Sequence, residues 1–224
     1  MSAPVGLVTG SMPFAGLPDN PAQDLLARVE GAVIGGVTIR TAALPVSRAR
    51  LPGVVEGLIA EHRPAFYVSL GLALGAPVLR LETTAINRTD FGVADNEGAR
   101  PTDGGPIDAD GPPARLATWD AKALAATLLA HDLPAVVSHH AGTHLCNLVL
   151  YTGLGAMARA GLPGPVGFFH LPYSPEQVAR FLREGPEGGD SAPITPRALP
   201  SMAMDLQERA VRLLLQELAR GAGL

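Results

Sequence analysis

The sequence has a single cysteine, Cys146, and few aromatic residues. One cysteine cannot form an internal disulfide, so a reducing compartment such as the cytoplasm is expected. Aromatic residues make up only 4% of the chain, whereas the hydrophobic fraction is 47%. This fraction lies well above that of disordered chains, and alanine, leucine and valine must therefore fill the core.

The sequence also lacks any apolar run that approaches the length of a membrane span, and its first residues lack the basic region and cleavage site of a secretory signal. Lysine and arginine number 17 against 21 aspartates and glutamates, which gives a formal net charge of −4. This balance argues against nucleic acid or an anionic membrane as a partner. The Gly-x-Gly-x-x-Gly and Walker patterns of phosphate-binding loops are absent too.

Short apolar runs typical of buried strands alternate with helical patterns along the chain. The expected strands span residues 5–9, 37–44, 65–70, 78–86, 134–138 and 165–171. A first helix is expected to begin at the Asn20-Pro21 pair. The other expected helices span residues 51–62, 119–129, 143–160, 175–182 and 202–220. Two stretches are irregular, residues 96–113 and 184–200, and the first is the longest loop, of a length that is often functional.

Chains that alternate strand and helix form a mostly parallel sheet between layers of helices. No linker or repeat divides the 224 residues, so we predict a single α/β domain over residues 1–224. In such sheets, sites form where strands end and helices begin. Gly10, Ser138 and His170 each follow an apolar strand, and these positions are therefore predicted to converge on one crevice.

Cys146 lies in a run, residues 138–147, that joins a strand-like segment to a helix-like one. A helix start favours negative charge, and a thiol there ionises more easily to the nucleophilic thiolate. His170 could supply the base that cysteine catalysis needs, together with an orienting carboxylate or amide and oxyanion donors. The alternative is that Cys146 is a small buried hydrophobe and His170 a structural histidine.

A metal site is the other interpretation of this region, because His139, His140 and His144 lie close to Cys146 in sequence. Two histidines four apart share a helix face only where the segment is helical, and the intervening Ala-Gly pair argues against a helix. No further ligands follow at the spacing of zinc sites. We therefore expect neither a metal nor a cofactor.

Four blocks resemble, in order and at similar spacing, the pyroglutamyl peptidase I family of cysteine peptidases. They are LVTGSMPFAG with NP (residues 7–16 and 20–21), ETTAIN with DNEG (82–87 and 95–98), AGTHLCN with a following tyrosine (141–147 and 151), and GFFHLPY with PEQ (167–173 and 175–177). Each block alone is a weak signal, but four in order from about residue 5 to about residue 180 are a strong one.

The resemblance implies a catalytic triad of Cys146, His170 and Glu82. The implied reaction removes an N-terminal pyroglutamyl residue from peptides through a thioester intermediate, without metal or cofactor. It also implies a three-layer α/β/α sandwich with a mixed, mostly parallel sheet, a cytoplasmic location and a homotetramer. The implied partners are N-terminally pyroglutamylated peptides and further copies of the chain.

The residues expected to bind the substrate are Phe14, Ser11, Leu72 and Asn96. Phe14 is the expected apolar wall of the pocket for the uncharged lactam ring. Ser11 stands where the family has an aromatic residue, and Leu72 where glutamine is common. Asn96, like its neighbour Asp95, either contacts substrate or only forms an Asx-type turn.

Two further departures concern the chemistry. Gly92 replaces an arginine that the family often places near the oxyanion, and His139 and His140 stand where the family has asparagine and a small residue. The triad itself is intact, so hydrolysis is the favoured reading. The departures motivate a second hypothesis, a catalytically weak or silent relative that binds pyroglutamyl peptides or a partner. Phosphorylase-like or peptidyl-tRNA hydrolase-like enzymes are disfavoured, because the basic residues are few and scattered.

Overall fold

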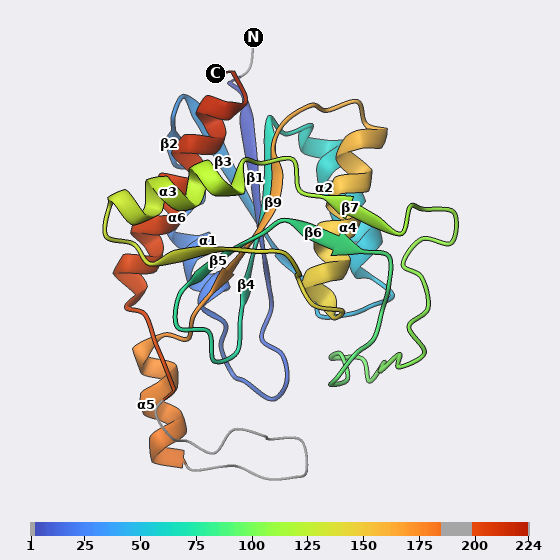
Figure 1. Ribbon diagram of the computed structural model, residues 1–224, viewed down its shortest axis with the longest axis vertical. Helices are drawn as coiled ribbons and strands as arrows, with labels where there is room; N and C mark the ends of the chain where they lie inside the picture. Colours follow the sequence, from blue (N-terminus) through green and yellow to red (C-terminus); the bar gives the residue numbers. More distant parts are fainter. Residues whose placement is uncertain (1–2, 185–198, 224) are drawn as a thin grey trace.

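The computed structural model describes residues 3–184 and 199–223, and it is built around a seven-stranded sheet (Figure 1). The strand order is β2 (Val33–Ile34), β3 (Val37–Leu44), β1 (Val5–Ser11), β4 (Phe66–Leu72), β9 (Val166–Leu171), β5 (Leu79–Glu82) and β8 (Ala135–Ser138). The pairings β1–β3, β1–β4, β4–β9 and β5–β8 are parallel. The pairings β2–β3 and β5–β9 are antiparallel, so β5 and β8 run against the central strands.

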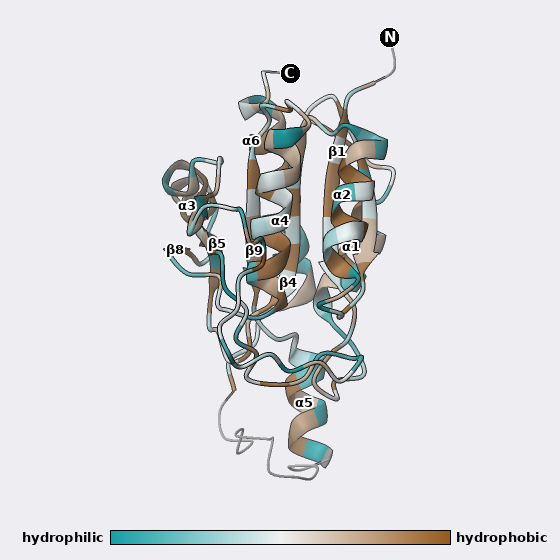
Figure 2. Cartoon of the chain, turned by 90° about the vertical axis from the view of Figure 1, so that its right-hand side faces the viewer, coloured by the Kyte–Doolittle hydropathy of each residue, from teal (hydrophilic) through white to brown (hydrophobic). Residues whose placement is uncertain are grey.

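Helices cover both faces of this sheet. The helices α1 (Pro21–Val29), α3 (Ala121–Ala130) and α6 (Met204–Gly221) pack on one face, and α2 (Leu51–His62) and α4 (Leu145–Arg159) on the other. Helix α5 (Pro175–Glu184) projects beyond the sheet (Figure 1). Figure 2 looks on to the α2/α4 face, where the strands behind the helices are mostly apolar. The predicted sheet between helix layers is confirmed.

Two hydrophobic cores lie back to back on the sheet. In β4, alternate residues such as Phe66 and Val68 face the α1/α3/α6 core, while Tyr67 faces the α2/α4 core. All seven residues of β4 are buried. A strand with both faces covered reads as a continuous apolar run, which explains why this segment shows little alternation in sequence.

The start of α1 follows the predicted capping signal. The side chain of Asn20 accepts a hydrogen bond from the backbone N–H of Ala22 at 3.1 Å, and Pro21 occupies the first turn. The Asn20 amide also donates to the carbonyl of Met12 at 3.4 Å. This cap therefore ends the loop that follows β1 as well as starting the helix.

The segment at residues 78–86 is not the single strand that was predicted. It divides into β5, within the large sheet, and β6 (Thr84–Ile86), which pairs with β7 (Ala114–Leu116) in a separate two-stranded ribbon. At the division, Thr83 donates its backbone N–H to the carbonyl of Ser138, and the chain then leaves the sheet. The sequence pattern continues across Thr83, so only long-range pairing reveals the break.

The strand predicted at residues 134–138 is β8, but it is not covered on both faces. It forms the edge of the sheet, and the side chain of Val136 is 45% exposed. Between Ile86 and Ala114 the structure has no helix or strand among the described residues, as predicted for this long loop. Of the second irregular stretch predicted, residues 185–198 lie outside the described residues.

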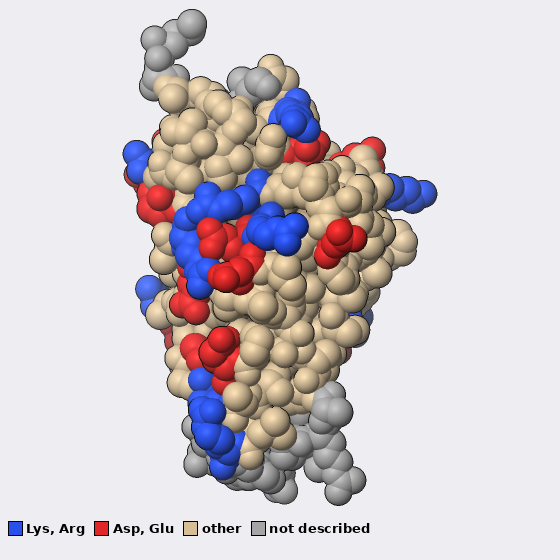
Figure 3. Space-filling model, turned by 90° about the vertical axis from the view of Figure 1, so that its left-hand side faces the viewer, with Lys and Arg blue, Asp and Glu red and all other residues tan. Residues whose placement is uncertain are grey.

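Charged side chains of both signs are mixed on the surface of the α1/α3/α6 side (Figure 3). Arg28 on α1 pairs with Asp205 at 3.1 Å and with Glu208 at 2.8 Å, both on α6. Because these pairs lie at the surface, where solvent screens the charges, they contribute little to stability. Within the described ranges, no helix has the length and apolar character that crossing a membrane requires.

A pair of glycine substitutions tests the packing of α4 on the sheet. An added Cβ at Gly153 in α4 would lie 2.3 Å from the ring of the buried Tyr67, whereas at Gly57 in α2 it would meet nothing within 4 Å. We expect Gly153→Ala to lower the free energy of unfolding by about 1–3 kcal/mol through overpacking. The control Gly57→Ala should raise it by roughly 0.5–1 kcal/mol through helix propensity. Urea denaturation measures both, and equal shifts would contradict the packing described.

Candidate active site

Cys146 lies in the first turn of α4, next to the centre of the sheet. The backbone at His144, which caps the helix, is extended, and in the part of the chain that the structure describes its side chain makes no capping hydrogen bond. An added Cβ at Gly71 on β4 would lie 3.5 Å from the Cys146 sulfur. The absence of a side chain at Gly71 leaves room for the Phe168 ring, which an added Cβ would approach to 2.6 Å, while the Cys146 thiol lies above β4 at a helix end that favours negative charge.

His170 and Glu82 come from adjacent antiparallel strands and face the same side as Cys146. The imidazole Nδ1 donates a hydrogen bond to Glu82 Oε1 at 2.7 Å. Glu82 is 1% exposed, and its second oxygen, Oε2, has no partner among the described residues. The ring of Phe168, 4.6 Å from the imidazole between ring centroids, packs against His170. The imidazole orientation is therefore fixed by one charged contact and one aromatic contact.

The charge on His170 depends on Cys146. Burial alone lowers the pKa of His170, but the negative charge of the Cys146 thiolate, its hydrogen bond to the imidazole and the Glu82 carboxylate together raise the pKa to about 9. A histidine so placed holds its proton at neutral pH. The geometry thus brings the three predicted triad residues together around a protonated imidazole.

Asn147, the residue after the cysteine, fastens α4 to the segment after Glu82. Its side-chain oxygen accepts the N–H of Ile86 at 2.8 Å, and its amide donates to the carbonyls of Ile86 at 2.9 Å and Arg88 at 3.1 Å. These bonds join the element that bears the nucleophile to the chain that bears the carboxylate. The sequence contains Asn147 within a motif, but its contacts could not be read from it.

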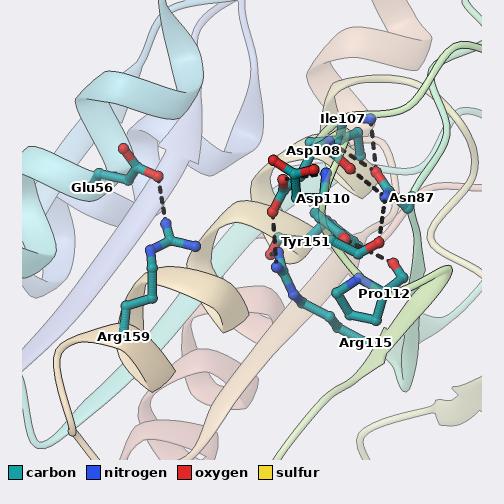
Figure 4. A network of polar contacts seen from close by, with 10 residues as sticks. Glu56, Asn87, Ile107, Asp108, Asp110, Pro112, Arg115, Tyr151 and Arg159 are labelled. Carbon is teal, nitrogen blue, oxygen red and sulfur yellow. Dashed lines mark hydrogen bonds and ion pairs between the residues drawn. The ribbon is translucent and has the colours of Figure 1, made fainter.

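A second polar network holds the long loop against the middle of α4 (Figure 4). Arg115 donates to the carbonyl of Tyr151 at 2.9 Å, pairs with Asp108 at 3.2 Å and lies over the Tyr151 ring at 3.9 Å. The Tyr151 hydroxyl donates to the carbonyl of Pro112 at 2.8 Å. Asn87 accepts the N–H groups of Ile107 and Asp108. This network borders a cavity of about 560 Å³ that does not include Cys146.

Three of the four predicted substrate-binding residues lie around the end of β1, two of them in β1 and the loop after it and one in the long loop bonded to that loop. Ser11 is the last residue of β1, and Phe14 packs against the α2/α4 core. The amide of Asn96 donates to the carbonyl of Pro13 at 2.9 Å, so the long loop is tied to the opening loop.

Leu72 lies apart from these three. Its position on β4 pairs with Leu171 of β9, and Leu70 and Leu171 belong to the α1/α3/α6 core. Because paired residues in neighbouring strands share a face, the side chain of Leu72 points away from Cys146. The resemblance alone could not show this, because the face is set by strand register.

Two aromatic rings beside Phe14 were missed by the sequence reasoning. The His144 ring lies 4.1 Å from the fully buried ring of Phe91 and 6.5 Å from that of Phe14, measured between centroids. Burial lowers the pKa of His144, and its Nε2 donates to the carbonyl of Val93 at 3.1 Å. A neutral, apolar wall therefore continues from Phe14 toward the start of α4.

The neighbouring acidic and histidine side chains bind backbone or hydroxyl groups. Asp95 accepts three backbone N–H groups, from Arg48, Glu97 and Ala99, as an Asx-type turn would. His139 shares a hydrogen bond with the Thr83 hydroxyl, and His140 accepts the N–H of Gly142. Across residues 3–184 and 199–223, no group of three or more potential metal ligands converges.

A buried carboxylate, an imidazole and a cysteine at a helix start form the arrangement used by cysteine hydrolases. The pyroglutamyl peptidase family model matches residues 5–219. A pyrrolidone-carboxylate peptidase of Pyrococcus furiosus is 32% identical over 94% of this chain and 95% of its own. Pyrrolidone-carboxylate peptidase 1 of Ralstonia nicotianae is 39% identical over 79% of this chain and 81% of its own.

The solved structures agree with the sequences. A crystal structure of the P. furiosus pyrrolidone carboxyl peptidase superposes with a TM-score of 0.89 at 31% identity, covering 97% of this chain and 99% of that one. This chain belongs to the pyroglutamyl peptidase family.

Removing the thiol should lower the pKa of His170. With Cys146→Ala, burial is no longer outweighed by the thiolate, so His170 should titrate well below the value of about 9 in the parent protein. Its raised pKa contributes stability that is fully present below pH 6.5 and is lost as pH rises through about 9. NMR titration of the imidazole and urea unfolding between pH 6 and 10 measure these effects. Identical titration of His170 in both proteins would contradict the thiolate–imidazolium pair.

Proposed function

We propose that the protein is a cysteine exopeptidase that hydrolyses the bond after an N-terminal pyroglutamyl residue of peptides. The observation that carries this proposal is the 2.7 Å contact of Glu82 with His170 beside Cys146, in a chain of the pyroglutamyl peptidase family. The relatives compared above are named for the same substrate group, pyrrolidone carboxylate. The reaction draws on side chains and backbone alone.

The proposed mechanism has two steps. The Cys146 thiolate attacks the pyroglutamyl carbonyl carbon, the C–N bond breaks, and the His170 imidazolium gives its proton to the departing amine. Water then attacks the thioester while neutral His170 takes its proton, which releases pyroglutamate and restores the thiolate. Glu82 keeps Nδ1–H directed toward itself, so Nε2 faces the reacting atoms. The uncapped first-turn N–H groups of α4, including that of Cys146, are suited to bind the oxyanion.

The pyroglutamyl ring is proposed to lie on the β1 side of Cys146. Phe14, with Phe91 and His144 behind it, would form the apolar wall, and Ser11 would leave more room there than an aromatic residue does. Asn96 would hold the opening loop through its bond to Pro13. Leu72 is assigned a backbone role, because its side chain faces the opposite core.

Three further proposals rest on the resemblance. They are that residues 1–224 form one domain, that the protein assembles as a homotetramer and that it works in the cytoplasm. The single cysteine fits a reducing compartment, since it leaves no internal disulfide to be formed. Light scattering of the purified protein tests the tetramer.

The competing proposal is a weak or silent relative that binds pyroglutamyl peptides without turning them over. The observation that favours it is Gly92, where the family has an arginine and where an added Cβ would meet nothing within 4 Å. Turnover of several pyroglutamyl-X peptides separates the two proposals, because the silent relative would bind them and release no pyroglutamate.

Substitution of the triad tests the mechanism. Cys146→Ala and His170→Ala should each abolish release of a fluorophore from a pyroglutamyl amide. Glu82→Gln should retain partial activity, with a loss of kcat roughly 10²-fold smaller than that of Cys146→Ala, because an orienting residue is less essential than the nucleophile. Full activity of Cys146→Ala or His170→Ala would refute the assignment.

Chemical modification gives an independent check on the nucleophile. One equivalent of iodoacetamide should inactivate the enzyme by alkylating Cys146, the only cysteine. The Cys146→Ala variant serves as the control and should take up no label. Labelling that leaves the parent protein active would count against a catalytic thiolate.

A further inference from the structure

Arg80 lies directly beside the catalytic histidine, on the strand that carries Glu82. In the antiparallel pairing of β5 with β9, Arg80 is opposite His170, and Glu82 is opposite Phe168. The neighbours of Arg80 in sequence, Leu79 and Leu81, are fully buried in the α1/α3/α6 core. Since side chains alternate along a strand, Arg80 projects to the same face as His170, with the two Cβ atoms about 4.5–5.5 Å apart.

The guanidinium of Arg80 is not paired with any carboxylate of the described residues. No ion pair or hydrogen bond within residues 3–184 and 199–223 involves it, although it is partly buried. Glu82, the nearest acid on the same strand and face, directs Oε1 to His170. A partly buried arginine in this position has a free planar fork of donors, which matches a carboxylate group.

The register of the strands shows which side of the reaction centre Arg80 occupies. One row of paired positions crosses four neighbouring strands, from β4 through β9 and β5 to the edge strand β8. Its members, in this order, are Gly71, His170, Arg80 and Val136. Gly71 lies next to the Cys146 sulfur. The strand β1, which ends at Ser11, lies beyond β4 on the other side. Arg80 is therefore separated by His170 from the flank proposed to hold the pyroglutamyl ring.

A substrate whose ring lies over β1 and β4 must extend its remaining residues toward β5 and β8. The imidazole that protonates the departing amine stands between these two flanks. The groups that follow the scissile bond then pass over Arg80 and the exposed Val136. On this path they pass Arg80, which projects from the same face as His170.

We infer that Arg80 is a specificity-determining residue that binds a carboxylate on the leaving side of the scissile bond. The inference rests on the proposed peptidase function and narrows its substrates to short pyroglutamyl peptides that carry a carboxylate near the cleaved bond. The carboxylate is either the free C-terminus of a pyroglutamyl dipeptide or an acidic side chain of the residue after pyroglutamate. Both present the same group to the guanidinium.

Three substrates separate these sources: pyroglutamyl-alanine, pyroglutamyl-alanine amide and pyroglutamyl-glutamate α-amide. The parent protein should cleave at least one carboxylate substrate with kcat/KM about fivefold above that of the neutral amide. The Arg80→Met variant should lower this ratio to about one, and Arg80→Glu should reverse it. The control Arg40→Met, at an exposed residue of β3, should keep the parent ratio.

The salt dependence of the parent protein gives a second test that needs no variant. Between 0.05 and 0.5 M sodium chloride the preference for the carboxylate substrate should fall, because salt screens a partly exposed charge pair. A preference that is absent in the parent protein, or that persists in Arg80→Met, would overturn the inference while leaving the peptidase function standing. Failure of the parent protein to cleave any of the three substrates would overturn the proposed function itself.

Discussion

The structure depends on the antiparallel pairing of β5 with β9. This pairing places Glu82 and His170 on one face of the sheet and within 2.7 Å of each other. A carboxylate that is 1% exposed is costly to bury unless a charged or hydrogen-bonded partner offsets the loss of water. His170 is that partner, and Cys146 in turn keeps His170 protonated. The charge of His170 thus depends on both of its neighbours, Glu82 and Cys146.

The fold supplies this set from two directions. Strand β9 runs parallel to the central strands and ends just after His170, while β5 and β8 run in the opposite direction and end at a similar level. Gly10 and Ser138 also lie at this level. Their strands run in opposite directions, however, so the two residues do not lie at one common carboxyl end of the strands, where sites were predicted to form. Helix α4 is then fixed over the sheet by Asn147, whose three bonds join it to the chain just beyond Glu82.

Local signals predicted the elements whose formation depends on near neighbours. The helix Leu51–His62 and the cap at Asn20 follow from periodicity and capping alone, and the motif blocks point to the triad. The break at Thr83 and the exposure of Val136 could not be predicted, because both depend on which distant strand lies alongside. The same holds for Leu72, whose motif position suggests the pocket while its register turns the side chain to the other core. The wall of Phe91 and His144 arises from segments that meet only in the folded chain, where His144 bonds to Val93, 51 residues away in sequence.

The position of His170 in the middle of a row of strands divides the site into two halves with different physical characters. The half over β1 and β4 is bordered by aromatic rings and by the covering helices, which suits an uncharged lactam ring. The half over β5 and β8 ends at the edge strand β8 with the exposed Val136, and the inner strand β5 carries Arg80, which has no carboxylate partner among the described residues. In the arrangement proposed here, the flank over β1 and β4 is fixed by packing, and the charge at position 80 sets the electrostatic preference of the other flank, because Arg80 faces the same side as His170 and takes no part in the bond between Glu82 and His170.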